Sequence, residues 1–224
     1  MTRGWLWWSS GKDAAWALRR LREDPSRRVE RLITTFIEGR ERASGHEIDR
    51  VIVRAQARAV GLPLVEVAVP EGASNRRYEE AIAPVLAEAA ASGIREMWFG
   101  DLHLADIRDY RLGLLEGTGL SGGFPLWTDD TARLALEMID GGLDARVVAV
   151  DPLRVPEELL GERFDRAWLE RLPPTADPCG EAGEFHTCVV HSPDFAAPLR
   201  VVPAERHERR GLLYQGLRLA GDQE

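Results

Sequence analysis

Residues 5–21 read WLWWSSGKDAAWALRRL, and this stretch decides the fold class. An apolar run ends at Ser9, a loop of small residues follows, and apolar residues then recur at helical spacing as far as Asp24. This order predicts a buried strand over residues 5–9, a tight loop, and an amphipathic helix. A loop in this position directs backbone N–H groups and the positive end of the helix toward an anion.

Further strands and helices alternate downstream of this unit. A helix over residues 44–60 is predicted to begin with the capping-box spacing Ser44-x-x-Glu47 and to end before Gly61. The alternation predicts an α/β fold with a parallel sheet, helices on both faces, and ligands at the carboxyl ends of the strands. The other predicted strands cover residues 32–37, 64–69, 97–99 and 146–150, and the other helices cover residues 75–92, 104–115 and 128–139.

The pattern changes after Pro156. It predicts one helix over residues 157–172, then a loop rich in Gly and Glu, and then short strands over residues 185–191, 199–202 and 211–219. Short elements of this kind, spread over roughly 70 residues, make a thin core of their own. We therefore expect a small α+β appendage over residues 156–224, packed against the parallel sheet of residues 1–155.

Composition and charge limit the classes of function. The formal net charge of −8 argues against non-specific nucleic-acid binding, which needs a positive face. The apolar runs are far shorter than the roughly 20 residues of a membrane span, and no secretory leader pattern opens the chain, so we expect a cytoplasmic protein. Cys179 and Cys188 match neither a disulfide framework nor a paired-CxxC zinc site, and we expect reduced thiols.

The loop contains the only lysine of the chain, Lys12, among 28 arginines. A compact ammonium suits a phosphate held as a point charge in a tight loop. The spacing is not that of a Walker A loop, because Leu6 stands where that loop needs glycine and Asp13 where it needs Ser or Thr. Two interpretations of Asp13 stay open: it is a magnesium partner, or a first-turn acid stabilised by the helix dipole.

Residues 9–14 (SSGKDA) resemble the SGGKDS loop of the ATP pyrophosphatase, or adenine-nucleotide α-hydrolase, superfamily, and in particular of the diphthine–ammonia ligase family. The resemblance runs in order from about residue 5 to residue 195. Gly100-Asp101 belongs to it, with Arg108 and Arg111 downstream. The other matching segments are residues 61–64 (GLPL), 124–127 (FPLW) and 180–187 (GEAGEFHT), of which the last is the most specific.

The resemblance implies a Rossmann-like sheet of the HUP type and an enzyme that uses ATP with Mg²⁺. In that reaction a substrate carboxylate attacks the α phosphorus, pyrophosphate leaves, and ammonia captures the acyl-adenylate. Residues 1–155 would bind ATP, and residues 156–224 would form the site of the acceptor, whose identity the sequence leaves open. The partners would thus be ATP, ammonia and an acceptor carboxylate, with no membrane or nucleic acid.

The resemblance also assigns site residues. The loop would hold the departing phosphates and, through Asp13, the Mg²⁺, while Lys12 and Asp13 would act in catalysis together with two acids of the C-terminal motif. The nucleotide-binding positions would be Ser9, Ser10, Gly11, Lys12, Asp13, Thr35, Phe36, Gly100 and Asp101. The acceptor or ammonia positions would be Arg108, Glu181, Glu184, His186 and Thr187.

Two loop positions depart from the family pattern. Ser10 replaces a glycine, which costs about 1 kcal/mol if the backbone there needs a positive φ. Ala14 lacks a hydroxyl that could bond a phosphate. Phosphate binding is expected to be weaker than in relatives with the full loop.

Other interpretations remain open at this point. A pyrophosphatase-type enzyme could act on a different acceptor, and a regulatory protein could hold ATP or AMP without turnover. Judged without the resemblance, residues 180–187 are typical of a mobile acidic loop with Phe185 anchoring a strand, and a lone His186 is typical of a structural histidine. Pyrophosphate release separates the enzymes from the regulatory protein.

Overall fold

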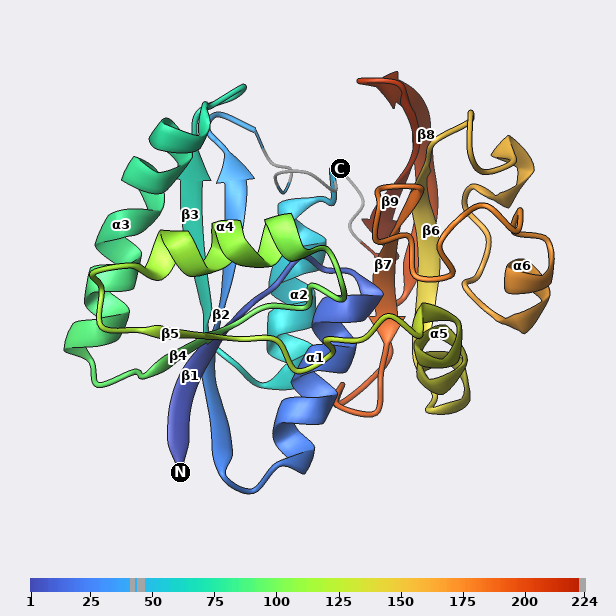
Figure 1. Ribbon diagram of the computed structural model, residues 1–224. Coiled ribbons are helices and arrows are strands. Elements are labelled where there is room, and N and C mark those ends of the chain that lie inside the picture. Colours follow the sequence, from blue (N-terminus) through green and yellow to red (C-terminus); the bar gives the residue numbers. More distant parts are fainter. Residues whose placement is uncertain (41–42, 44–46, 222–224) are drawn as a thin grey trace.

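The structure is a computed structural model that describes residues 1–40, 43 and 47–221. Figure 1 shows two sheets with helices between and around them. In chain order the elements are β1 (Thr2–Trp7), α1 (Lys12–Glu23), β2 (Arg27–Ile37), α2 (Arg50–Val60), β3 (Leu64–Val69), α3 (Asn75–Ala91), β4 (Glu96–Trp98), α4 (Ala105–Leu115), β5 (Ser121–Gly123), α5 (Thr131–Asp140), β6 (Asp144–Val150), η1 (Glu157–Leu159), α6 (Arg166–Glu170), β7 (Phe185–His191), β8 (Val201–Arg209) and β9 (Leu212–Leu219).

The first sheet has five strands in the order β3-β2-β1-β4-β5, and all its pairings are parallel. Alternate residues from Trp5 to Trp8, at the end of β1 and just after it, pack into two different cores. Trp5 and Trp7 pack with apolar residues of α3 and α4, whereas Leu6 and Trp8 pack with those of α1 and α2. The apolar run is continuous because both faces of this strand are covered, as the sequence predicted.

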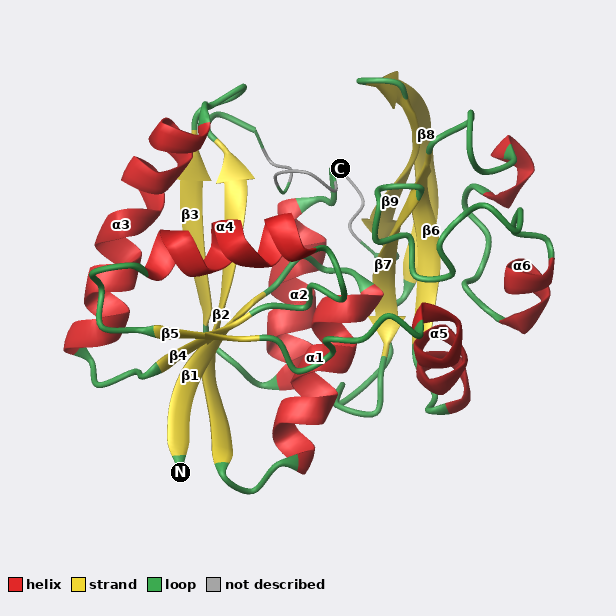
Figure 2. Cartoon of the chain, in the orientation of Figure 1, coloured by secondary structure: helices red, strands yellow, loops and turns green. Residues whose placement is uncertain are grey.

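The second sheet is antiparallel, with the order β7-β6-β9-β8. Helices α1 and α2 lie between the two sheets, and α5 and α6 lie on the far side of the second one (Figure 2). Strand β7 contacts α1, and β9 contacts α2. The predicted α/β fold with a packed C-terminal appendage is therefore confirmed. No helix in the described part of the chain is long and apolar enough to cross a bilayer.

The strand predicted over residues 146–150 does not belong to the parallel sheet, and that assignment is wrong. It is β6, which pairs antiparallel with β7 and β9. An apolar run indicates burial but not the sheet in which the strand pairs. The fifth parallel strand is instead β5, three residues long with two glycines, a composition that predicts a turn.

The single helix predicted over residues 157–172 is also wrong. The chain forms a short 3₁₀ turn, η1, and a five-residue helix, α6. Between them Gly161 has φ +87°, its N–H donates to Val147 O at 2.8 Å, and Phe164 N–H donates to Ala145 O at 2.9 Å. These bonds to β6 take the backbone out of helical geometry.

Two predicted boundaries also move. Helix α2 begins at Arg50 with Asp49 as its cap, which accepts from Val51 N–H, so Glu47 lies before the helix. Ser44 of the predicted capping box lies outside the described residues. Strand β8 covers Val201–Arg209 and is longer than the run predicted over residues 199–202.

Gly4 lets β1 lie close to β4. A Cβ at this position would lie 2.5 Å from the Trp98 ring and 2.6 Å from Glu96 O. We expect Gly4→Ala to lower the free energy of unfolding by about 2 kcal/mol through overpacking, measured by urea denaturation. Gly113→Ala in helix α4 is the control, because its added Cβ would meet no atom of the described residues within 4 Å outside its own stretch of helix. The control should stabilise by about 0.5 kcal/mol, and equal effects at both sites would contradict this packing.

Candidate functional site

The loop after β1 is held in place by β7. Ser10 is fully buried with φ +71°, and its carbonyl accepts from Val189 N–H at 2.9 Å. Gly11 is the N-cap of α1 and has no side chain that could cap the helix. Thr187 Oγ1 accepts from Lys12 N–H at 3.1 Å. The loop has the strand-loop-helix geometry of an anion site.

The Lys12 side chain is buried beneath this loop. Its Nζ lies 2.8 Å from Asp13 Oδ2, donates to Cys179 O, and lies 5.4 Å from the centroid of the Phe185 ring. Burial lowers the pKa of Lys12, but the charges and hydrogen bond of Asp13, Cys179 and Glu181 together outweigh burial, and the pKa ends above its ordinary value. The side chain is therefore a fixed positive charge in an apolar wall.

The carboxyl end of β4 reaches the same place. A Cβ at Gly100 would lie 3.1 Å from Ala14 N, so glycine allows this strand end to approach the start of α1. Asp101 Oδ2 accepts from Arg111 Nε at 3.2 Å. The Arg111 guanidinium lies 5.6 Å from the centroid of the Trp7 ring and 5.2 Å from that of Phe99. Asp101 is thus held by an arginine that two aromatic rings orient.

The motif over residues 180–187 supplies the third wall. Gly180 and Gly183 have φ values of +68° and +82°, which turn the loop back toward α1. Glu181 Oε1 accepts from Leu102 N–H at 2.8 Å, so the loop bonds to the segment after β4. Burial raises the pKa of Glu181, and the nearby charges of Asp13 and Asp101 raise it further. This carboxylate is therefore closer to protonation than an exposed one.

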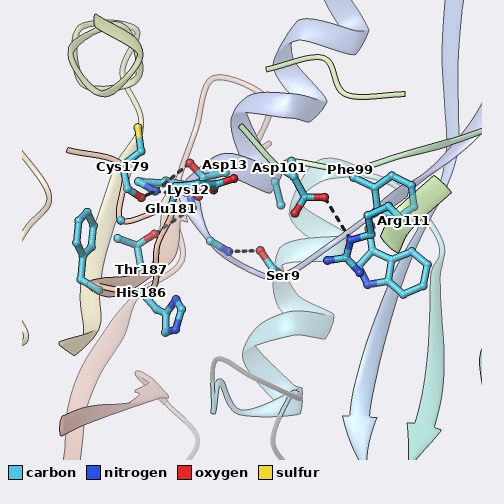
Figure 3. Close-up of a pocket in the computed structure, with 17 residues that line it drawn as sticks. Ser9, Lys12, Asp13, Phe99, Asp101, Arg111, Cys179, Glu181, His186 and Thr187 are labelled. Atoms are coloured by element: carbon cyan, nitrogen blue, oxygen red, sulfur yellow. Dashed lines mark hydrogen bonds and ion pairs between the residues drawn. The ribbon is translucent and has the colours of Figure 1, made fainter. Parts of the chain in front are cut away.

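These three walls enclose one cavity of about 190 Å³. Figure 3 shows Lys12, Asp13, Glu181 and Cys179 on one side of Ser9, and Asp101, Arg111 and Phe99 on the other. Nine of the predicted site residues line it: Ser9, Gly11, Lys12, Asp13, Gly100, Asp101, Glu181, His186 and Thr187.

Five other predicted positions do not line this cavity. Ser10 lies buried within the loop, and Phe36 packs in the core beside α2, next to Thr35. Arg108 lies over the Trp127 ring at 4.5 Å. Glu184 points away, with its carboxylate 2.5 Å from Arg154. The structure therefore separates the two acids of the motif, although both were predicted to act at the acceptor.

Several lining residues were not predicted as site residues: Trp7, Ala14, Phe99, Arg111, Cys179, Gly180, Gly183 and Phe185. Arg111 had a signal, since it lies ten residues after Asp101 in a matching segment. Trp7 and Phe99 had none, because a cavity-facing aromatic in a buried strand looks like core. Cys179 contributes its backbone carbonyl, which the sequence does not reveal.

Two family models match most of the chain. A model of the diphthamide synthase N-terminal domain matches residues 2–109, and a model of the diphthamide synthase C-terminal domain matches residues 130–216. The chain belongs to the diphthamide synthase family. A search of curated proteins finds no match.

The resemblance to the diphthine–ammonia ligase family is thereby confirmed. The cavity draws on both matched ranges of this diphthamide synthase family member, with the loop after β1 from the first and the motif over residues 180–187 from the second. The predicted division at residue 155 stays a prediction, and β6, which precedes it, pairs in the second sheet.

Ser10 keeps a strained backbone where the diphthine–ammonia ligase loop has glycine. Its φ of +71° is in the left-handed region, and its Oγ is buried without a hydrogen-bond partner among the described residues. Ser10→Gly should therefore raise the free energy of unfolding by about 1 kcal/mol in urea denaturation. Ser10→Ala loses the hydroxyl but retains Cβ, so it should gain less. Equal gains would show that the backbone is not the source of strain.

His186 gives a pH dependence with a defined sign. Burial and the nearby Lys12 charge lower the pKa of His186 from 6.5 to about 4. Between these pH values the unfolded chain binds more protons, so the folded state should lose stability as pH falls through this window. His186→Asn should flatten the curve of unfolding free energy against pH between pH 6.5 and pH 4. Identical slopes in both proteins would contradict the lowered pKa.

Proposed function

We propose that this protein is an ATP-dependent amide ligase of the diphthine–ammonia ligase type. It would adenylate a substrate carboxylate, release pyrophosphate, and transfer the acyl group to ammonia. One observation carries the proposal. A single cavity, built from both family-matched parts, is lined by a helix N-terminus with the only lysine of the chain and by Glu181, an acid with a raised pKa.

The loop and helix α1 fit the phosphates of ATP. The N-cap residue of α1, Gly11, has no side chain, and Gly100 lets the end of β4 lie against the start of this helix at the cavity. Lys12 provides a compact positive charge at the cavity wall. These features support Ser9, Gly11, Lys12 and Asp13 as the phosphate-binding group.

The charge of the cavity favours binding of ATP together with Mg²⁺. Two cations, Lys12 and Arg111, face three carboxylates, Asp13, Asp101 and Glu181. A polyphosphate needs further positive charge there, and Mg²⁺ would supply it by neutralising phosphate oxygens. No group of three or more His, Cys, Asp or Glu side chains in the described part of the chain could by itself hold a metal. Nucleotide-bound Mg²⁺ typically uses only one or two carboxylates, and Asp13 and Asp101 are the candidates.

In the first half-reaction a carboxylate oxygen of the acceptor bonds to the α phosphorus. The bond from that phosphorus to the bridging oxygen breaks, and pyrophosphate leaves with the electron pair. The positive end of α1 and Lys12 would stabilise the charge that develops on the leaving group. Because this charge grows in the transition state, their effect would fall on turnover as well as on binding.

In the second half-reaction the nitrogen of ammonia bonds to the acyl carbon, AMP leaves, and the nitrogen loses a proton. Glu181 is the acid of the motif that faces the cavity, and its raised pKa suits it to accept that proton. We assign the acceptor half-reaction to Glu181 and not to Glu184, which bonds Arg154 outside the cavity.

ATP binding and turnover test the proposal together. Calorimetry should show ATP binding that depends on Mg²⁺. Asp13→Asn should weaken this binding by roughly tenfold, because the loss of one charged partner of a bound ion typically lowers affinity by about this factor. The control Asp109→Asn changes a carboxylate whose side chain is 71% exposed, and it should leave the affinity unchanged. Pyrophosphate release should require an elongation factor that carries diphthine, and ammonium should be needed for release to continue beyond one equivalent per enzyme.

Other results of these two measurements would change the proposed function in specific ways. Pyrophosphate release with a different carboxylate would keep the chemistry and change the acceptor. Binding of ATP without pyrophosphate release for any acceptor would indicate a regulatory nucleotide-binding protein. Equal ATP affinity in wild type and Asp13→Asn would remove Asp13 from the site.

A further inference from the structure

Charged groups behind the cavity hold the loop over residues 177–184. The Glu184 side chain is 2% exposed, and its Oε1 accepts from Arg154 Nη2 at 2.5 Å and from Asp177 N–H at 3.2 Å. Its Oε2 is buried and has no hydrogen-bond partner among the described residues. A buried carboxylate with one unsatisfied oxygen depends strongly on the cation that pairs with it.

Arg154 contacts the same loop a second time. Its Nη1 donates to Ala182 O at 2.8 Å. The turn after β6 fixes the arginine itself, because Arg154 N–H donates to Asp151 O at 3.0 Å and Asp151 N–H donates to Glu184 O at 2.8 Å. Arg154 therefore connects the end of β6 to two points of the loop.

The other side of this loop supplies groups to the cavity. Cys179 O accepts from Lys12 Nζ, and Glu181 Oε1 accepts from Leu102 N–H. Gly180 and Gly183, both at positive φ, flank the Glu181 position. Glycine adds conformational freedom to the backbone, so contacts at the two ends of the loop must hold it in one conformation. Movement at Glu184 would be passed to Cys179 and Glu181 through this short segment.

We propose that Arg154 is a positioning residue that sets the place of Lys12 and Glu181 in the cavity. It pairs with Glu184 behind the loop and thereby holds the Cys179 carbonyl against the Lys12 ammonium. Arg154 does not line the cavity, so it acts through the loop. The positioning stands on these contacts alone, and its meaning for catalysis rests on the proposed ligase function.

The single lysine gives a direct test. Protein labelled with ¹³C-lysine yields one lysine side-chain NMR signal, that of Lys12, in the nucleotide-free chain. Arg154→Gln should shift this signal, because the loop opens to hydrate Glu184 and withdraws the Cys179 carbonyl. The Lys12 side chain is 3% exposed, so its acylation by an amine reagent should accelerate by about tenfold once the loop opens.

Two variants serve as controls. Arg154→Lys keeps a cation near Glu184 and should move the Lys12 signal back toward its wild-type position. Arg171→Gln removes a surface arginine that pairs with Glu162 at 2.7 Å, and it should leave the signal and the acylation rate unchanged. Glu184→Gln removes the buried charge itself, so it tests the loop even if Arg154→Gln does not fold. It should shift the Lys12 signal in the same direction.

An unchanged Lys12 signal and acylation rate in folded Arg154→Gln and Glu184→Gln would overturn the positioning role. ATP titration of the same proteins separates the two proposals. If the variants shift the Lys12 NMR signal but the wild-type protein binds no ATP, the ligase function is contradicted and the positioning role remains. If the Lys12 NMR signal does not shift in the variants but the wild-type protein binds and cleaves ATP, the positioning role is contradicted and the ligase function remains.

Discussion

The contact between the loop after β1 and strand β7 joins the two halves of the molecule. Val189 N–H donates to the Ser10 carbonyl, and Thr187 Oγ1 accepts from Lys12 N–H. These bonds fix the start of helix α1 against a strand almost 180 residues away. The cavity exists because a parallel and an antiparallel sheet meet at this loop.

This arrangement explains why the cavity is chemically asymmetric. The parallel sheet contributes backbone groups and Asp101 at the carboxyl ends of its strands, as open α/β sheets commonly do. The antiparallel part contributes the Cys179 carbonyl, Glu181 and the aromatic wall beside Lys12. In the proposed ligase reaction, a nucleotide in the first part and a second reactant in the second part would meet at the loop between them.

The buried charged groups on the two sides of the motif over residues 180–187 have different surroundings. Lys12 and Asp13 pair at the cavity, where a ligand can exchange with either partner. Glu184 pairs with Arg154 behind the loop, outside the cavity lining. Two acids three residues apart thus have different environments, because the left-handed turns at Gly180 and Gly183 reverse the chain around Glu181. A substitution at either acid acts on a different property of the site.

The sequence by itself determined the α/β class, the strand-loop-helix unit around residues 9–13 and the family, because hydrophobic period, glycine placement and motif spacing can be read directly from the chain. It also indicated the strain at Ser10, since a loop that needs a positive φ disfavours any residue but glycine. Only the tertiary structure decided that β6 pairs in the second sheet, that Glu181 faces the cavity and Glu184 does not, and that Trp7, Phe99 and Arg111 complete its wall. These outcomes depend on contacts between segments 30 to 180 residues apart, such as Arg154 with Glu184 and Lys12 with Cys179, and a local pattern carries no information about them.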